Sequence, residues 1–267
     1  MEQVSTNNKR QSSSFTVIYI GGPTAILEIG GLRFMIDPTL DPEGTVYHIP
    51  NLTVEKTKGP ATLDIGKIDV VLLSHDQHYD NFDNAGRLLV QKVSKTYTTV
   101  SGAGRLKGTS VGLSTWQSDT IVTPDGTNIE ITSTPARHGP AGIEKIQGEV
   151  TGFILSVKGK EKFEIYITGD TTYYEGVAEV AKRYTPKYLF LFGGASHTRG
   201  PFSVSMSTND AMDTALAFPT ATIIPLHYDG WKHYTQNEKD IKASYEVIGI
   251  GDRLKILEAG IPTVIEV

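Results

Sequence analysis

The chain repeatedly places an imidazole or a carboxylate directly after a short apolar run of strand-type residues. This happens in residues 70–81, 135–139, 166–171 and 224–229. Side chains that follow neighbouring strands meet at one edge of a sheet. Four distant segments are therefore expected to lie together there, which requires a sheet-based fold with a polar site at the strand ends.

The side chains at these strand ends are of the kinds that bind metals. The six candidate ligands are His75, His78, Asp80, His138, Asp170 and His227. Imidazole and carboxylate together suit zinc, manganese or iron, whereas carboxylates alone would suggest magnesium or calcium. Gly169 lets the backbone approach closely before Asp170, whose carboxylate could bridge two metals. We therefore expect one or two divalent metal ions (Zn, Mn or Fe).

Composition excludes several other classes. The chain has no cysteine, so disulfides, thiolate ligands and a cysteine nucleophile are excluded. It also has no Gly-x-Ser-x-Gly sequence, and a metal-activated water needs neither nucleophile. A formal net charge of -5, with both signs spread along the chain, argues against a dedicated nucleic-acid surface. We see no apolar run long enough to span a membrane and no secretion signal, which fits a cytoplasmic protein.

The chain is expected to fold as one domain. Residues 1–14 are polar and predict a poorly ordered tail, and residues 15–267 form the domain, because any cut would separate the candidate ligands. Strands are expected at 15–20, 24–29 and 32–36, followed by a long loop or flap over 39–63 and by short strands from 96 to 135. The second half alternates strands and helices, so a layered α/β sandwich is expected.

Helix-capping patterns and closing strands mark the second half. Ser207 is expected to cap a helix that runs to about Phe218. A capping box over residues 235–238 predicts the start of the last helix. Residues 254–257 and 263–266 are expected to be closing strands.

Six ordered motifs extend the pattern over most of the chain. They are Ile20-Gly21-Gly22-Pro23-Thr24-Ala25, Gly30-Gly31-Leu32-Arg33-Phe34-Met35-Ile36-Asp37-Pro38, Leu73-Ser74-His75-Asp76, Thr134-Pro135-Ala136-Arg137-His138-Gly139-Pro140, Thr168-Gly169-Asp170 and Pro225-Leu226-His227. Together they resemble the metallo-β-lactamase fold superfamily. The nearest likeness is to the branch of ascorbate-6-phosphate lactonases and related metal-dependent hydrolases.

The resemblance implies a four-layer αββα sandwich with the site at the mouth between the sheets. It also implies that His75, His78 and His138 hold a first metal. Asp80 and His227 would hold a second, and Asp170 would bridge the two.

The chain departs from the superfamily pattern His-x-His-x-Asp-His at two positions. Gln77 is an additional residue between the first two histidines, and Asn81 stands where the last histidine is expected. An amide oxygen is a poorer ligand for zinc-type metals than imidazole. One tightly held metal is therefore expected, with Asn81 and Asp37 as weak ligands or hydrogen-bonding supports; Asp37 also fits a turn residue before proline.

Candidate substrate contacts are few. Those near the expected site are Tyr79, Arg137, His197, Arg199 and Trp231. The two arginines and His197 suit an anionic group, although they also fit ordinary surface residues, and Trp231 fits a core position equally well.

The sequence therefore predicts a cytoplasmic metal-dependent hydrolase that uses a metal-activated water on an ester, lactone or phosphodiester of a small anionic metabolite. Asp80 and Asp170 would be its catalytic carboxylates. The alternatives are a phosphodiesterase and a catalytically weak, metabolite-binding member of the fold, which Asn81 favours. No membrane and no large nucleic acid is expected as a partner, and a homo-oligomer is compatible with the sequence.

Overall fold

Two large β-sheets form the centre of the protein. A computed structural model describes residues 14–49 and 52–267, and within them the first sheet has seven strands and the second has six. The first sheet runs in the order β15 (Pro262–Glu266), β1 (Ser14–Gly21), β2 (Thr24–Ile29), β3 (Leu32–Ile36), β6 (Val70–Leu72), β7 (Lys95–Thr98) and β8 (Ser110–Gly112). The second runs β14 (Thr222–Leu226), β13 (Tyr188–Phe192), β12 (Lys162–Ile167), β11 (Thr151–Lys158), β10 (Asn128–Pro135) and β9 (Ser118–Val122). A separate hairpin consists of β4 (Val46–Ile49) and β5 (Leu52–Glu55).

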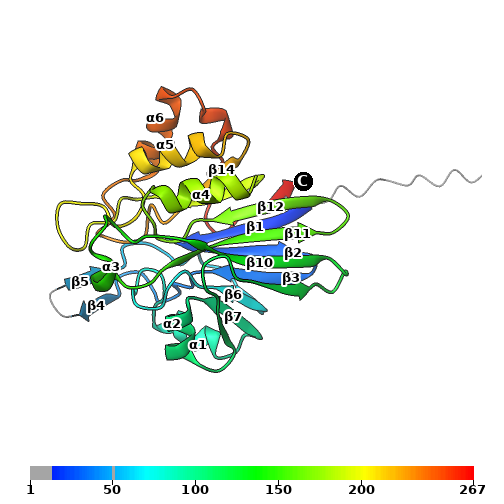
Figure 1. Cartoon of the computed structure of the whole chain (residues 1–267). Helices are drawn as coiled ribbons and strands as arrows, with labels where there is room; N and C mark the ends of the chain where they lie inside the picture. The colour runs from blue at the N-terminus through cyan, green and yellow to red at the C-terminus, as the bar shows by residue number, and fades with distance from the viewer. Residues whose placement is uncertain (1–13, 50–51) are drawn as a thin grey trace, which may run out of the picture.

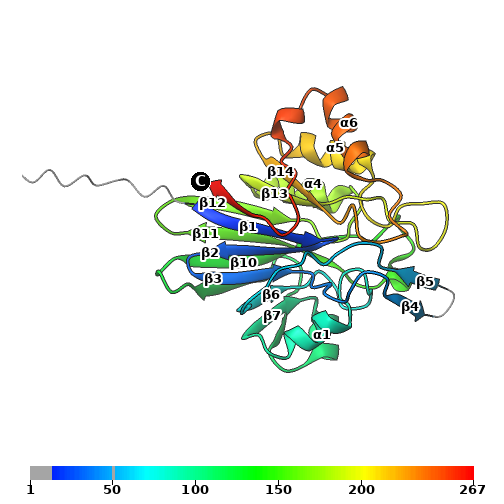
Figure 2. The same cartoon turned by 180° about the vertical axis from the view of Figure 1, so that it is seen from behind.

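Helices cover the outer face of each sheet. In Figure 1, α1 (Asn84–Val90) and α2 (Val100–Leu106) lie below the first sheet. On the opposite side lie α4 (Glu175–Arg183), α5 (Thr208–Ala217) and α6 (Glu238–Val247), and Figure 2 shows the same layers from behind. Two short helical segments are α3 (Glu144–Gln147) and η1 (Gly251–Arg253). The αββα sandwich is thus confirmed, and none of the helices in the described residues has the length and apolarity needed to cross a membrane.

Strand β1 shows why two cores form. Val17 and Tyr19 belong to the large core between the sheets, whereas Ile18 and Ile20 pack with Val90 of α1 in a second core. Successive side chains of a strand point to opposite faces, so an apolar residue at every position fills both cores. The strand is therefore buried on both faces.

The strand directions bring the functional loops to one end. In the first sheet β3, β6 and β7 are parallel, and in the second β12, β13 and β14 are parallel. Strand β10 has the same direction as β12, because both are antiparallel to β11 between them. The loops after these strands therefore open together, at the end of the sandwich where the β4–β5 hairpin lies in Figure 1.

Two segments differ from the sequence-based expectation. Residues 39–63, expected to be a loop, contain the β4–β5 hairpin, in which Tyr47 and Val54 pack with Trp231 in a small buried cluster. Residues 100–106, expected among short strands, form α2, which Thr99 caps by accepting from Gly102 N. Both elements are short and gain their stability from packing against distant residues.

Two predictions for the helix caps and chain ends are confirmed and two are wrong, and residues 263–266 lie in strand β15 as expected. Ser207 caps α5 and forms a capping box with Asp210. The cap of α6 is Asn237, because the hydroxyl of Thr235 instead donates to the carbonyl of Ala195 at 2.7 Å. Residues 254–257 form no strand and make only one isolated bridge to β14. Of the expected tail, residues 1–13 lie outside the described residues, and Ser14 opens β1.

Candidate metal centre

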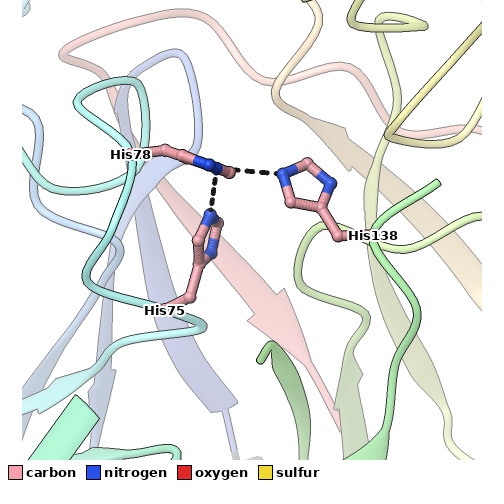
Figure 3. Close-up of side chains that lie close together, drawn as sticks. All are labelled: His75, His78 and His138. Carbon is pink, nitrogen blue, oxygen red and sulfur yellow. Dashed lines mark hydrogen bonds between the residues drawn. The ribbon is translucent and has the colours of Figure 1, made fainter. Parts of the chain in front are cut away.

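Three histidines from both sheets converge at the mouth of the sandwich, as Figure 3 shows. His75 and His78 follow β6, and His138 follows β10. His75 Nε2 lies 2.9 Å and His138 Nε2 lies 3.0 Å from His78 Nδ1. Nitrogen ligands around one zinc-type ion stand at about this spacing, since each bond is about 2.0–2.1 Å long. Gln77 therefore does not keep His78 out of the group, because His78 presents Nδ1.

Hydrogen bonds hold two of these rings from behind. The Nδ1 atom of His138 lies 2.6 Å from the carbonyl of Val204, and that of His75 lies 2.9 Å from Ser74 Oγ. With the proton on Nδ1, the lone pair of Nε2 points into the group. This is the arrangement that metal-binding histidines usually show.

The environment keeps the imidazoles of His75 and His78 neutral. Burial, and then the electrostatic influence of His78 and His138, holds the pKa of His75 well below its usual value. Burial and then His138 lower the pKa of His78 to about 4. Metal binding requires neutral imidazole, so His75 and His78 are in their binding form at neutral pH.

We expect the metal held by the three histidines to stay bound at pH 5.5. Protons compete for an imidazole only as the pH approaches its pKa, so His75 and His78 should not weaken metal binding above about pH 5. An unperturbed imidazole, with a pKa near 6.5, would lose about tenfold per unit below that value. Equilibrium dialysis against buffered zinc at pH 7.5, 6.5 and 5.5 measures the retention. A loss of affinity of much more than about tenfold between the last two would contradict the neutral state of His75 and His78.

A second group of three ligands lies beside the first. Asp80 follows His78 in the same loop, Asp170 follows β12 and His227 follows β14. His227 Nε2 lies 3.1 Å from Asp170 Oδ1 and 3.7 Å from Asp80 Oδ2. The other oxygen of Asp170, Oδ2, lies 3.7 Å from His138 Nε2. Asp170 thus presents one oxygen to each group, as a bridging ligand does.

The buried polar atoms of the second group fit a cation. Both carboxylate oxygens of Asp170 and Nε2 of His227 are buried and make no hydrogen bond within the described residues. The same is true of Oδ1 of Asn81, the residue after Asp80. Unpaired buried polar atoms are costly. A divalent metal would satisfy the converging atoms of Asp170 and His227, so the donor set fits one.

The charges agree with that fit. Burial opposes a charge on His227, but Asp170 and Asp80 outweigh it and raise the pKa of His227 to about 10. Burial likewise opposes ionisation of Asp80, yet His233 and His227 hold its pKa well below the usual range. Two ionised carboxylates in a buried place attract positive charge, which a divalent metal would supply.

The comparison with protein families agrees with this geometry. Residues 32–228 match the model of the β-lactamase superfamily domain. The chain belongs to this superfamily.

Relatives and solved structures of the superfamily extend the match. A UPF0173 metal-dependent hydrolase from Pelotomaculum thermopropionicum is 29% identical over 253 residues, which cover 91% of this chain and 97% of the relative. The UPF0173 protein YddR of Bacillus subtilis is 22% identical over 254 residues, with 91% and 97% coverage. The crystal structure of an isothiocyanate hydrolase from Delia radicum gut bacteria superposes with a TM-score of 0.80 at 22% identity, covering 94% of this chain and 100% of that one. The structures confirm the fold, and the family match with the relatives' names confirms the predicted enzyme class, a metal-dependent hydrolase.

Within this superfamily member, Asp37 and Asn81 support the centre from behind. Asp37 Oδ1 accepts from Ser74 N at 2.6 Å, and its Oδ2 accepts from Ser74 Oγ at 2.5 Å and from Asn81 Nδ2 at 3.0 Å. Burial, opposed by these hydrogen bonds, raises the pKa of Asp37 to about 7. Since Ser74 also contacts His75, Asp37 links the first group to Asn81. Both carboxylate oxygens of Asp37 accept these hydrogen bonds, so Asp37 acts as a support for the ligand loop. Oδ1 of Asn81 has no hydrogen-bond partner within the described residues.

A small cavity of about 20 Å³ borders both groups of ligands. Its lining includes His78, Asp80 and His138 together with two predicted substrate contacts, Tyr79 and Arg199. The other lining residues are Ile49, Leu52, Val54, Gln147, Ser196, Thr198 and Val204. The cavity is thus lined by His78 and His138 of the first group and by Asp80 of the second.

The other three predicted contacts lie elsewhere. Arg137 donates from Nε to the carbonyl of Gly139, and its Cζ lies 4.4 Å from the ring centroid of Tyr174. His197 Nε2 lies 3.2 Å from Ser203 Oγ, and Trp231 is buried beneath the hairpin. None of the three lines the cavity.

Sequence reasoning missed two features of the site. The apolar wall from the hairpin falls in the segment expected to be a loop. The second is His233, whose Nε2 lies 2.8 Å from Asp80 Oδ2. His233 follows no strand, so the strand-end pattern did not select it; the only signal was the run of aromatic and cationic residues after His227.

Proposed function

We propose that the protein hydrolyses an ester, a lactone or a phosphodiester of a small anionic metabolite. The observation that carries this proposal is Asp170, which presents one oxygen to each ligand group at 3.1 Å and 3.7 Å, next to a cavity lined by residues of both groups. A divalent metal bound there would polarise the scissile group and lower the pKa of a water molecule to near neutrality. Whether this metal is zinc, manganese or iron is decided by elemental analysis.

The two carboxylates have different tasks. Asp170 is fully buried and bridges the groups, so it fixes their separation. Asp80 lines the cavity and is ionised, so it can accept a hydrogen bond from the attacking water. A carboxylate with a strongly lowered pKa is a weak proton acceptor. We therefore assign Asp80 to orienting water more than to removing its proton.

Arg199 supports the anionic substrate. Its Nε donates to Gln147 Oε1 at 3.2 Å, which fixes the side chain in the cavity wall. No other hydrogen bond of its guanidinium is formed within the described residues, so the remaining donors can hold a carboxylate or phosphate.

A small-molecule substrate, a cytoplasmic location and the narrower likeness to ascorbate-6-phosphate lactonases are further parts of this proposal.

A second candidate substrate class is favoured by the apolar residues of the cavity lining. The apolar lining residues are Ile49, Leu52, Val54 and Val204. A neutral substrate with a short apolar arm would bury it there. Isothiocyanates are such compounds, and water adds to their electrophilic central carbon. The structure of the isothiocyanate hydrolase named above shares the fold, which makes this class worth testing.

A substrate panel with an Arg199→Met variant tests both candidates. Protein purified without chelator is first analysed for metal, and then assayed with an anionic ester, a lactone, a phosphodiester and an alkyl isothiocyanate. If the substrate is anionic, Arg199→Met should raise KM about tenfold or more, because a charge-assisted contact contributes roughly 1.5–3 kcal/mol.

The outcomes separate the candidates. Turnover of the isothiocyanate alone, unchanged in Arg199→Met, would favour the neutral substrate. Arg183→Met is the matched control, since Arg183 lies on α4 and packs over Trp116, away from the cavity. A protein that holds metal but turns over no member of the panel would contradict the proposed function and favour a metabolite-binding role.

A further inference from the structure

His233 reaches the second ligand group from an unexpected place. It lies in the segment between β14 and α6, where Ser196 and Tyr234 form an isolated bridge. Its Nε2 stands 2.8 Å from Asp80 Oδ2, the same oxygen that lies 3.7 Å from His227 Nε2. Asp80 is thus contacted by two imidazoles, one from the strand end and one from the loop that follows.

The surroundings of His233 fix its ring. Its side chain is only 9% exposed, and Tyr234 packs edge-on against the ring with centroids 4.9 Å apart. Its backbone carbonyl accepts from His197 N at 3.0 Å. Its Nδ1 is buried without a hydrogen bond in the described residues. An ionised carboxylate can only accept a hydrogen bond, so the proton belongs on Nε2, where it is donated to Asp80.

The second group needs such support more than the first. The first group has three imidazoles, two of which are held from behind by Ser74 and Val204. The second has a single imidazole, from His227, because Asn81 brings an amide and spends its nitrogen on Asp37. Metal-binding carboxylates are normally held by hydrogen bonds from neighbouring groups. Only His233 and the contact with His227 are found on Asp80 within the described residues.

We propose that His233 is the positioning residue of the second metal position, which it secures by donating a hydrogen bond from Nε2 to Asp80. It is not among the residues whose ligand atoms converge in that group, which is why we assign it to holding Asp80 and not to binding the metal directly. The proposal rests on the metal centre proposed above. It implies that a loop histidine compensates for the weak amide at Asn81.

The test compares His233→Ala with His233→Gln. Each purified full-length protein is stripped of metal, titrated with buffered zinc, and analysed by elemental mass spectrometry for the number of zinc ions and their affinities. We expect His233→Ala to bind the second zinc about 10- to 100-fold more weakly with the first unchanged, since loss of such a supporting contact costs this much. His233→Gln should stay within about threefold of wild type, because its side-chain amide can donate the same hydrogen bond.

Two further variants sharpen the result. Asn81→His in the His233→Ala background should restore the second zinc, because an additional imidazole ligand offsets a loosened Asp80. His48→Ala is the control, as His48 is exposed on β4 and lies outside both groups. The melting temperature of the metal-free proteins shows whether each variant folds. If His233→Ala does not fold, the zinc titration is carried out on His233→Gln.

Several outcomes would overturn the proposal. Wild-type affinities for both zinc ions in His233→Ala would remove any role of this residue. Loss of the second zinc in both His233→Ala and His233→Gln would show that the imidazole itself is a ligand. A wild-type protein that binds one zinc and hydrolyses substrate would also reject the proposal while leaving the hydrolase function intact. A protein without metal or hydrolysis would reject the function itself.

Discussion

Replacement of Asp170 by alanine is expected to lower kcat/KM at least about 100-fold and to reduce the metal content of the protein. Asp170 presents an oxygen to each ligand group, and both oxygens are buried without a hydrogen bond in the described residues. Loss of a residue that only supports a ligand lowers metal affinity or activity about 10- to 100-fold, so loss of a shared ligand should lower them at least as much. Elemental mass spectrometry and steady-state kinetics on the same preparation measure both effects.

Two other variants control this experiment. Asp170→Asn keeps the shape and removes the charge, so it separates the two contributions. Asp213→Ala removes an exposed carboxylate on α5 and should change neither quantity. Two metals and near wild-type hydrolysis in Asp170→Ala would show that the bridging position is not used.

Gly194→Ala is expected to lower the melting temperature by roughly 5–15 °C. Gly194 has a φ of +92°, and an added Cβ would stand 2.2 Å from the carbonyl oxygen of His227 and 3.1 Å from the Cα of Tyr228. Strain of the backbone together with overpacking costs about 2–4 kcal/mol. Relief of the clash would also move His227, so the second ligand group should lose affinity together with stability.

Gly104→Ala is the matched control for this change. Gly104 lies within α2, and an added Cβ there would have no neighbour within 4 Å. Alanine in a helix should leave the melting temperature equal or slightly higher. Thermal unfolding of the metal-free proteins measures both melting temperatures. Equal melting temperatures for the two variants would contradict the close approach of Gly194 to His227.

The strand-end pattern accounts for what the sequence could predict. His75, Asp170 and His227 each follow a strand that is parallel to at least one neighbour. His138 follows β10, which has the direction of β12, so a local pattern was enough to bring the four side chains together. The same reasoning gave the sandwich and most of its strands. Local patterns succeed here because buried strands require continuous apolar runs and end in turns.

The features that were missed depend on contacts between distant residues. The β4–β5 hairpin is held by Trp231, which lies far along the chain. Helix α2 contains two glycines, and Gly102 lies where a Cβ would stand 3.2 Å from the Asp76 carboxylate. Arg137 carries the right charge beside a ligand, yet its side chain turns toward Tyr174. No local propensity contains these contacts, so the sequence alone could not place them.

The ligand set joins the two layers of the sandwich. In each group at least one ligand follows a strand of the first sheet and another follows the second, as with His75 and His138. A bound ion therefore links layers that apolar packing otherwise holds together. By thermodynamic linkage, a metal at 100 times its Kd adds about 2.7 kcal/mol to the free energy of unfolding. The concentration of free metal would therefore set the fraction of this protein that is folded as well as the rate of hydrolysis.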